Sequence, residues 1–249
     1  MSIHTLVDRL CGRLHDTAQY TTQGVTLFVD LENRKTRRKY LPADVLTHFL
    51  GGRGANMWLL YNLLQEEKDA LDPEVPLIFG SGVLTSVMPS ATRGNFTSKS
   101  PESYAILDAN GGDYFPSFLK RHGYDHLVLY GKAAQWTLLR IALGEVTFED
   151  ATPYAGLDNL DTAAAVERDF NCKERKDMAL ARITSAGENG VLCAGIMGGI
   201  KAIWARGGGG AKMGAHNLKA IMVHGRPPEI ALPADAKAQN KAIGKKITG

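Results

Sequence analysis

Apolar residues recur along the chain at two spacings, and this mixture predicts both helices and strands. Over residues 3 to 14 they recur every three or four positions, which is typical of an amphipathic helix. Over residues 25 to 31, β-branched and aromatic residues dominate and favour a strand. Further strands are predicted over 76–80, 95–98, 104–107, 126–132, 137–143 and 218–225, and further helices over 42–50, 55–66, 115–123 and 158–170. Because helices and strands do not alternate strictly, we expect an α+β fold.

Two segments far apart in the chain resemble each other, which points to an internal duplication. Residues 121–132 align with 215–226, and the matched pairs are Leu127 with Ile221, Leu129 with Val223, His122 with His216, Gly131 with Gly225 and Lys132 with Arg226. The alternative is chance similarity between two strands that end in glycine. If the duplication is real, loops near Asn110 and Ile203 face each other across a pseudo-twofold axis and hold a two-headed ligand.

These patterns divide the chain into three parts. We expect residues 1–24 to form a helical extension, residues 25–230 a domain of two α+β halves, and residues 231–249 a polar tail or the start of a further domain. A basic run over residues 34–39 follows the first strand. It is typical of a solvated hairpin tip, and the alternative is a docking surface for an anionic partner.

Composition places the chain among globular proteins and excludes several classes. Hydrophobic residues make up 44% of the 249 residues, close to the globular average. The formal net charge of +3 is too mild to predict nucleic-acid binding by itself. The three cysteines, Cys11, Cys172 and Cys193, lie far apart, which favours a reducing compartment and excludes a self-contained four-cysteine zinc or iron–sulfur site.

No segment reads as a signal peptide or a membrane span. Charged residues such as Asp8 and Arg9 interrupt the first residues, and the longest uncharged run, 75–92, contains prolines, glycines and hydroxyls. We therefore expect a cytoplasmic protein that binds neither membrane nor nucleic acid.

Two glycine-rich loops have the composition of anion-binding nests. In segments 110–112 and 206–210, consecutive glycines let backbone N–H groups point at one phosphate, and Arg93 and Arg206 add forked donors. The alternative is that these glycines serve helix ends and tight turns. A phosphate loop of the P-loop type and a dinucleotide fingerprint are both absent. The seven histidines show no metal-binding spacing, and no catalytic set stands out.

An ordered set of short motifs carries a family resemblance. In sequence order they are Gly51-Gly52-Arg53-Gly54-Ala55, Leu84-Thr85, Arg93, Thr97-x-Lys99-Ser100-Pro101, Ala109-Asn110-x-Gly112-x-Tyr114-Phe115, Gly123-Tyr124-Asp125, Gly131-Lys132-Ala133, Ala186-Gly187-Glu188-Asn189, Arg206-Gly207-Gly208 and Asn217-Leu218-Lys219-Ala220-Ile221. With these motifs, residues 25 to 230 resemble the N-terminal domain of the aldehyde ferredoxin oxidoreductases, a family of tungsten–pterin or molybdenum–pterin enzymes.

The resemblance implies a duplicated mixed-sheet α+β domain on which a bis-pterin metal cofactor rests. The metal would be held by pterin sulfurs alone, and a magnesium ion bridging the two pterin phosphates would bind the backbone carbonyls of Asn110 and Ile203. The cofactor-binding residues implied by motif position are Arg93, Asn95, Asn110, Gly111, Gly112, Ile203, Ala205, Arg206, Gly207 and Gly208.

The chain departs from the family pattern at two places near this site. Lys201-Ala202-Ile203-Trp204 stands where the family has a histidine, an arginine and two alanines, so we expect Lys201 to replace the missing arginine's charge. Asp113 stands where the family has glycine, and we expect magnesium or Lys201 to screen its carboxylate.

The family's cluster-binding cysteines and its helical domains have no counterpart in this sequence. The chain corresponds to about the first third of a family member, either as a separate subunit or as a truncated product. The resemblance implies an oxidoreductase that converts aldehydes to carboxylates, with the [4Fe–4S] cluster and substrate channel on a partner chain, a ferredoxin-like electron acceptor and a possible homo-oligomer. The alternative is a non-catalytic cofactor carrier or assembly subunit, or a degenerate fragment.

Overall fold

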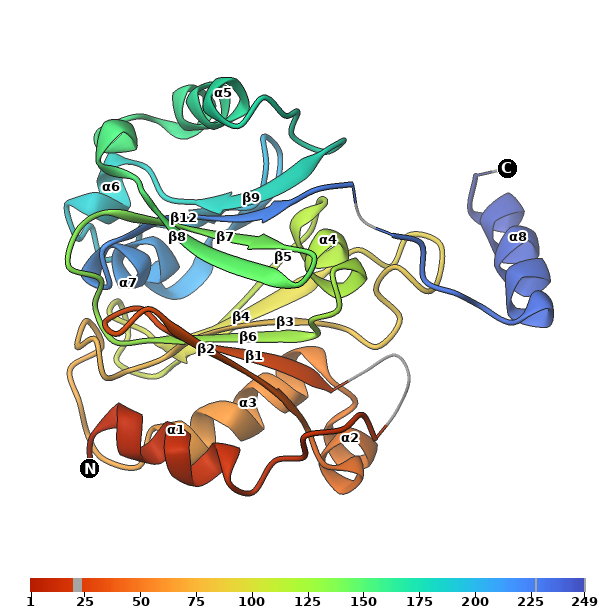
Figure 1. The fold of residues 1–249 in the computed structure, drawn as a ribbon, viewed down its shortest axis with the longest axis horizontal. Helices are drawn as coiled ribbons and strands as arrows, with labels where there is room; N and C mark the ends of the chain where they lie inside the picture. Colours follow the sequence, from red (N-terminus) through yellow and green to blue (C-terminus); the bar gives the residue numbers. More distant parts are fainter. Residues whose placement is uncertain (20–23, 227, 249) are drawn as a thin grey trace.

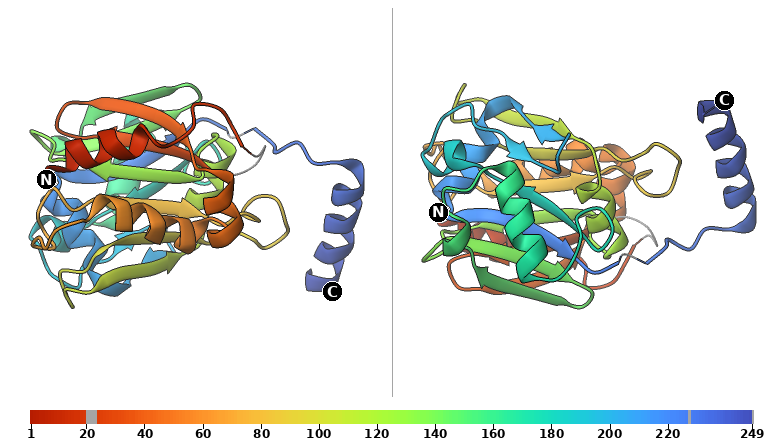
Figure 2. Two further views of the ribbon diagram at one scale, coloured as in Figure 1. Left: turned by 90° about the horizontal axis from the view of Figure 1, so that it is seen from below. Right: turned by 90° about the horizontal axis from the view of Figure 1, so that it is seen from above.

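The computed structural model describes residues 1–19, 24–226 and 228–248. The chain forms two six-stranded mixed sheets that face each other, with helices on their outer sides and between them (Figures 1 and 2). The α+β class expected from the mixed spacings is confirmed.

The first sheet comes from the N-terminal half of the chain. Its strands in spatial order are β2 (Lys35–Tyr40), β1 (Val25–Asp30), β6 (His126–Tyr130), β3 (Leu77–Ser81), β4 (Gly94–Lys99) and β5 (Ile106–Gly111). Strands β1 and β6 are parallel, and every other neighbouring pair is antiparallel. The outer face is covered by α1 (Ile3–Cys11), α2 (Ala43–Phe49) and α3 (Gly52–Leu63), as Figure 1 shows.

The second sheet repeats this arrangement. Its strands in spatial order are β8 (Glu145–Asp150), β7 (Thr137–Ala142), β12 (Leu218–His224), β9 (Met178–Arg182), β10 (Ile196–Met197) and β11 (Ile203–Trp204). Strands β7 and β12 are parallel, and the other pairs are antiparallel. Its outer face carries α5 (Asn159–Asp169), whose N-cap Asp158 accepts bonds from the N–H groups of residues 160 and 161, as expected.

The two halves therefore share one topology, with β6 equivalent to β12 and β5 equivalent to β11. The similar segments 121–132 and 215–226 contain β6 and β12, and the same hairpin and parallel pair flank both. Strands β5 and β11 lie against each other, so equivalent edges of the two sheets meet. The predicted duplication is borne out by this strand order.

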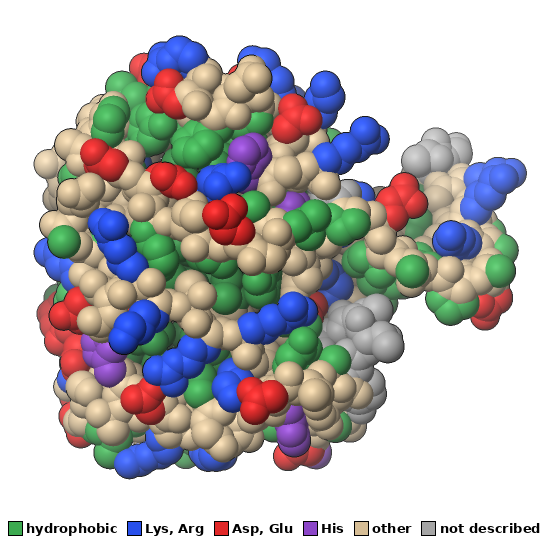
Figure 3. Space-filling view, in the orientation of Figure 1, with side chains coloured by type: hydrophobic (Ala, Val, Ile, Leu, Met, Phe, Trp, Pro, Cys, Tyr) green, Lys and Arg blue, Asp and Glu red, His purple; other side chains and the backbone are tan. Residues whose placement is uncertain are grey.

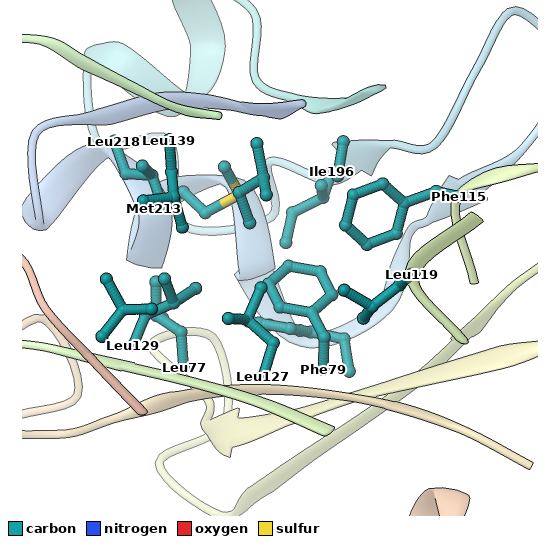
Figure 4. Close-up of a cluster of buried hydrophobic side chains, with 14 of the residues drawn as sticks. Leu77, Phe79, Phe115, Leu119, Leu127, Leu129, Leu139, Ile196, Met213 and Leu218 are labelled. Atoms are coloured by element: carbon teal, nitrogen blue, oxygen red, sulfur yellow. The ribbon is translucent and has the colours of Figure 1, made fainter. Parts of the chain in front are cut away.

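The space between the sheets is filled by one apolar core, shown in Figure 4. The first sheet contributes Leu77, Phe79, Leu127 and Leu129, and the second contributes Leu139, Ile196 and Leu218. Helices α4 (Phe115–Arg121) and α7 (Gly209–Ala215) lie between the sheets and add Phe115, Leu119 and Met213. Each fully buried side chain of this size contributes about 1.5–3 kcal/mol through the loss of apolar surface to water.

Several elements differ from the sequence-based expectation. The basic run does not form a hairpin tip: the turn lies before residue 35, and the charges lie in β2, an edge strand. Charged side chains on an edge strand discourage pairing with another sheet. The strand expected over 104–107 lies instead over 106–111 as β5, and β8 and the glycine-rich α7 were not expected.

The C-terminal segment, expected to be a polar tail or the start of a further domain, contains a helix. Helix α8 (Ala234–Thr248) lies apart from the two sheets in Figures 1 and 2. The Asn240 side-chain amide donates to the Val87 carbonyl oxygen at 2.6 Å, which ties α8 to the loop between β3 and β4. Within the described ranges, no helix has both the length and the apolar character needed to cross a membrane.

The tryptophan of β11 joins the two halves. Trp204 is 1% exposed, and its ring packs edge-on against Phe79 and Phe115 at centroid distances of 5.7 and 5.8 Å. Its indole N–H donates to the Gly94 carbonyl oxygen at 3.3 Å. A Cβ atom on Gly111 would lie 2.5 Å from this ring, so the close approach of β5 to the indole requires glycine there.

Gly111 and Gly112 form a matched pair that tests this contact. Gly111→Ala should lower the free energy of unfolding by about 1–3 kcal/mol, because the added methyl overpacks the core against the indole. Gly112→Ala should change it by less than about 1 kcal/mol, because no atom lies within 4 Å of a Cβ at that position. Urea unfolding curves measure both changes, and equal effects would contradict the packing described.

Candidate functional site

A surface cavity of about 500 Å³ lies where the equivalent sheet edges meet. Its lining comes from the end of β5, the turn before α4, the loop before β4, the turn before β9 and the start of β11. The lining residues are Thr92, Arg93, Asn110, Gly111, Gly112, Asp113, Arg175, Lys201, Ala202 and Ile203. The loops near Asn110 and Ile203, which correspond to each other in the internal duplication, thus line the same cavity.

The charges around this cavity favour an anionic ligand. Arg93, Arg175 and Lys201 supply three positive charges and Asp113 supplies one negative charge, so the lining carries a net +2. Among the described residues, no carboxylate lies within ion-pair distance of Arg93 or Lys201, and both are exposed at the surface. Forked guanidinium donors and an ammonium group are the side chains that bind phosphate oxygens.

The backbone leaves room for a ligand at the two equivalent strand ends. Asn110 and Ile203 are exposed, with 43% of Ile203 accessible, and both face the same cavity. A Cβ atom on Gly112 would meet no atom within 4 Å, so the backbone there is open to close approach. Trp204 is buried below, and therefore does not fill this space.

The remaining expected residues lie outside the lining. Residues 205–208 run along β5 away from the cavity: a Cβ on Gly207 would lie 2.8 Å from Leu107, and one on Gly208 would lie 2.7 Å from Pro101. The segment 206–208 is a short 3-10 helix that leads into α7, and Arg206 is exposed on it. Five of the ten expected residues therefore line the cavity: Arg93, Asn110, Gly111, Gly112 and Ile203.

Asn95 lies beneath the cavity and supports Asn110. Its amide nitrogen donates to the Asn110 side-chain oxygen at 3.2 Å and to Asp108 Oδ1 at 2.5 Å. Its own oxygen accepts from the Asn56 amide at 3.1 Å, and Asn56 Oδ1 lies 2.8 Å from His126 Nδ1. This chain of buried hydrogen bonds fixes the outer face of β5 at the site.

The same network shifts two pKa values. Burial lowers the pKa of the His126 imidazole from 6.5 to about 3, and the nearby Lys120 charge adds to this. Burial alone would raise the pKa of Asp108, but hydrogen bonds from Arg53 and Asn95 outweigh it and hold the pKa below its usual value. His126 is therefore neutral and Asp108 is ionised near neutral pH.

Asp113 pairs with a residue that the sequence did not single out. Its Oδ2 accepts from Arg175 Nη2 at 3.0 Å, so Arg175 pairs with this carboxylate, for which magnesium or Lys201 was the expected partner. Arg175 lies in the turn between α5 and β9 and carries no motif. The only signal in the sequence is a lone arginine in a polar stretch, which does not reveal a site.

Comparisons with known proteins identify the family. The family model described as the N-terminal domain of aldehyde ferredoxin oxidoreductase matches residues 26–225, which is most of the chain. The chain belongs to the aldehyde ferredoxin oxidoreductase family. The resemblance carried by the ordered motifs is thus confirmed.

Individual relatives agree with this assignment. The chain is 34% identical over 207 residues to the tungsten-containing aldehyde ferredoxin oxidoreductase of Pyrococcus furiosus, covering 83% of this chain and 34% of that protein. It is 34% identical over 221 residues to the aliphatic sulfonate oxidoreductase, WOR-like subunit, of the same organism, covering 84% of this chain and 35% of that protein. The chain therefore spans about a third of these relatives' length.

A solved structure shares the fold of this family member. The active site complex BamBC of benzoyl coenzyme A reductase, solved with 1,5-dienoyl-CoA, superposes with a TM-score of 0.77 at 31% identity. The match covers 82% of this chain and 31% of the other chain. The two-sheet architecture is thus shared with a chain of this benzoyl coenzyme A reductase complex.

The buried imidazole beneath the site makes stability depend on pH. Between pH 6.5 and about 3 the unfolded chain binds a proton that folded His126 does not bind, so the free energy of unfolding falls as the pH falls. His126→Gln should reduce this slope, measured by urea unfolding at pH 7 and pH 5. The control, His48→Gln, replaces an exposed histidine and should leave the slope as in the wild type. An unchanged slope in His126→Gln would contradict the neutral, buried imidazole.

Proposed function

We propose that this chain is the cofactor-binding base of a tungsten or molybdenum bis-pterin oxidoreductase that oxidises aldehydes to carboxylates. The observation that carries the proposal is the cavity in which the equivalent ends of β5 and β11 meet under a net charge of +2. A ligand with two similar phosphate-bearing heads fits a site built from two equivalent strand ends. The tungsten named for several relatives supports the metal assignment.

The residues of the cavity suit such a ligand. Arg93 and Lys201 are exposed cations that would bind phosphate oxygens, and the open backbone at Gly112 would let a phosphate or pterin edge approach closely. The backbone carbonyls of Asn110 and Ile203, at equivalent positions in the two halves, would bind a magnesium ion between the phosphates. Oxygen ligands are the ones this ion prefers.

The expected residues that do not line the cavity would support or extend the cofactor site along the β5 edge. Asn95 would position Asn110 through their hydrogen bond, and Gly111 would let β5 approach the indole beneath it. The segment 205–208, with exposed Arg206, would bind the more distant part of the cofactor along β5. All ten residues expected from the motifs thus keep a role in the proposal.

This chain would hold and orient the cofactor rather than supply the reacting groups. When bound, the metal–pterin group supplies two-electron redox chemistry that protein side chains lack. In the part of the chain that the structure describes, no group of three potential ligands among His, Cys, Asp and Glu is placed to hold a metal. The described thiols include Cys11 and Cys172, and burial raises the pKa of each to about 11. We assign no catalytic residue in this chain.

A partner chain would complete the enzyme on an apolar face formed by α3 and the start of β5. Tyr61 on α3, Tyr104 in the loop before β5 and Ile106 at the start of β5 are 76%, 65% and 62% exposed. A cavity of about 640 Å³ lies between α3 and Ile106, and most of its lining is apolar. Contiguous exposed apolar residues mark interaction surfaces. The partner would carry the [4Fe–4S] cluster and the substrate channel and would pass electrons to a ferredoxin-like acceptor.

We expect a small-molecule rather than a nucleic-acid partner, in line with the mild formal net charge of +3. Figure 3 shows Lys and Arg side chains mixed with Asp and Glu over the face it presents, without a field of one sign. Nucleic-acid binding proteins typically carry basic residues clustered on one face.

A carrier or assembly subunit without turnover is the second candidate function. The three cysteines are far apart in the sequence and two of them are buried, so they do not form a cluster site, and this favours the second candidate.

Arg93→Ala tests the cofactor site. In a complex purified with its partner, this variant should lose at least about tenfold in tungsten or molybdenum and pterin content, because a phosphate contact to a forked cation is removed. Metal content is read by elemental analysis, and pterin by fluorescence after oxidation. Arg168→Ala replaces an exposed arginine on α5 and should keep wild-type content. Equal cofactor content in both variants would overturn the site.

The apolar face is tested by charge substitution. The isolated chain should self-associate at micromolar concentration, and Tyr61→Glu with Ile106→Lys should make it monomeric and abolish capture of the partner chain, because charges replace apolar contact area. Size-exclusion chromatography with light scattering gives the mass. Leu160→Lys, on exposed α5, is the control and should leave both properties unchanged. A wild-type chain that elutes as a clean monomer and binds its partner independently of Tyr61 and Ile106 would exclude this face.

A further inference from the structure

An ion pair joins the two halves at the rim of the cavity and involves two unusual backbone conformations. Asp113 has φ of 66° and Arg175 has φ of 74°, in the left-handed region that non-glycine residues rarely adopt. Asp113 follows β5 in the first half, and Arg175 precedes β9 in the second half. Strained non-glycine residues cluster at functional sites, and here two such residues contact each other.

The surroundings hold the Arg175 guanidinium at the cavity. Its central carbon lies 5.3 Å from the centre of the Tyr114 ring, and its Nη2 donates to Asp113 Oδ2 at 3.0 Å. The Asp113 carboxylate is itself confined, because a Cβ on Gly199 would lie 2.3 Å from its Oδ2. The aromatic ring and the confined carboxylate leave the guanidinium little freedom to turn away from the lining.

The guanidinium keeps donors for a ligand. A guanidinium has five N–H groups, and within the described part of the chain the bond to Asp113 is the hydrogen bond it makes. Arg175 is 41% exposed at its side chain, whereas Asp113 is 9% exposed. Both side chains line the cavity, and the cation is the more accessible of the two.

We propose that Arg175 is a further phosphate-binding residue of this cavity, and that Asp113 and Tyr114 position it. The turn that carries Arg175 belongs to the second half and Asp113 belongs to the first half. The ion pair would therefore border the phosphate site from both halves. The inference rests on the proposed function, because it takes the cavity to receive a phosphate group. Arg175 is a positioned binding group, and it takes no part in a chemical step.

Binding of magnesium pyrophosphate to the full chain, measured by isothermal titration calorimetry, tests the proposal. Arg175→Ala should weaken binding about tenfold, and Arg175→Gln should weaken it similarly, because both remove the charge. Arg168→Ala is the matched arginine control on α5 and should bind as the wild type does. Thermal melting reports the folding of each variant, and Arg175→Gln keeps the test valid if the alanine variant does not fold.

A double variant separates direct binding from screening of Asp113. If Arg175 contacts phosphate, Asp113→Asn with Arg175→Ala should bind about tenfold more weakly than Asp113→Asn alone. If Arg175 serves only to neutralise the carboxylate, the two variants should bind equally, and the proposal is overturned.

Two further outcomes separate this proposal from the proposed function. Weakened binding in Arg93→Ala with unchanged binding in Arg175→Ala would overturn the role of Arg175 and keep the cavity as a phosphate site. Both would be overturned if the wild-type chain does not bind pyrophosphate, or if its affinity is unchanged in Arg93→Ala, Arg175→Ala and Arg175→Gln.

Discussion

The packing of Trp204 against β5 is the interaction on which the site depends. The indole from the second half lies against Gly111 and hydrogen-bonds to the Gly94 carbonyl in the first half, at the edge where β5 meets β11. This contact lies at the edge where the two equivalent strand ends open onto one cavity. The glycine at the end of edge strand β5 and the buried tryptophan depend on each other, because the ring occupies the space that a side chain at position 111 would fill.

The charge distribution follows from this geometry. Each half brings cations to the shared edge: Arg93 from the first, and Arg175 and Lys201 from the second. The single acidic residue in the lining, Asp113 of the first half, pairs with Arg175 of the second half. The cavity therefore keeps an excess of positive charge although this chain has aspartate at position 113. Beneath the surface, uncharged amides from Asn56 and Asn95 carry the hydrogen bonds, which avoids the cost of burying unpaired charges.

Much of this fold could be predicted from the sequence, and the reasons are physical. Strands such as β1 and β6 have continuous buried apolar residues, and Asp158 marks the start of α5 by its capping side chain. The duplication was visible because the central strands β6 and β12 share burial and end at glycine turns. Helix α7 was hidden, because its sequence is rich in glycine, which favours loops, and tertiary packing between the sheets overrides that preference.

The site was only partly predictable, because motifs report neighbours in sequence and not neighbours in space. Five of the ten expected residues meet in the cavity: Asn110, Gly111, Gly112 and Ile203 lie at two equivalent strand ends, and Arg93 precedes the neighbouring strand β4. Arg175 was missed because it reaches the site from a turn with no pattern of its own. The role of Trp204 was also hidden, because alternation along β11 turns its ring into the core and Ile203 toward the cavity, which a motif comparison does not reveal.

The most direct measurement of the central claim is a crystal structure of the chain soaked with magnesium pyrophosphate. The account predicts electron density for phosphate between the end of β5 and the start of β11, with a magnesium ion bound by the carbonyl oxygens of Asn110 and Ile203. Density at another surface, or strand ends whose carbonyls point away from each other, would contradict the claim that the duplicated halves form one anion site.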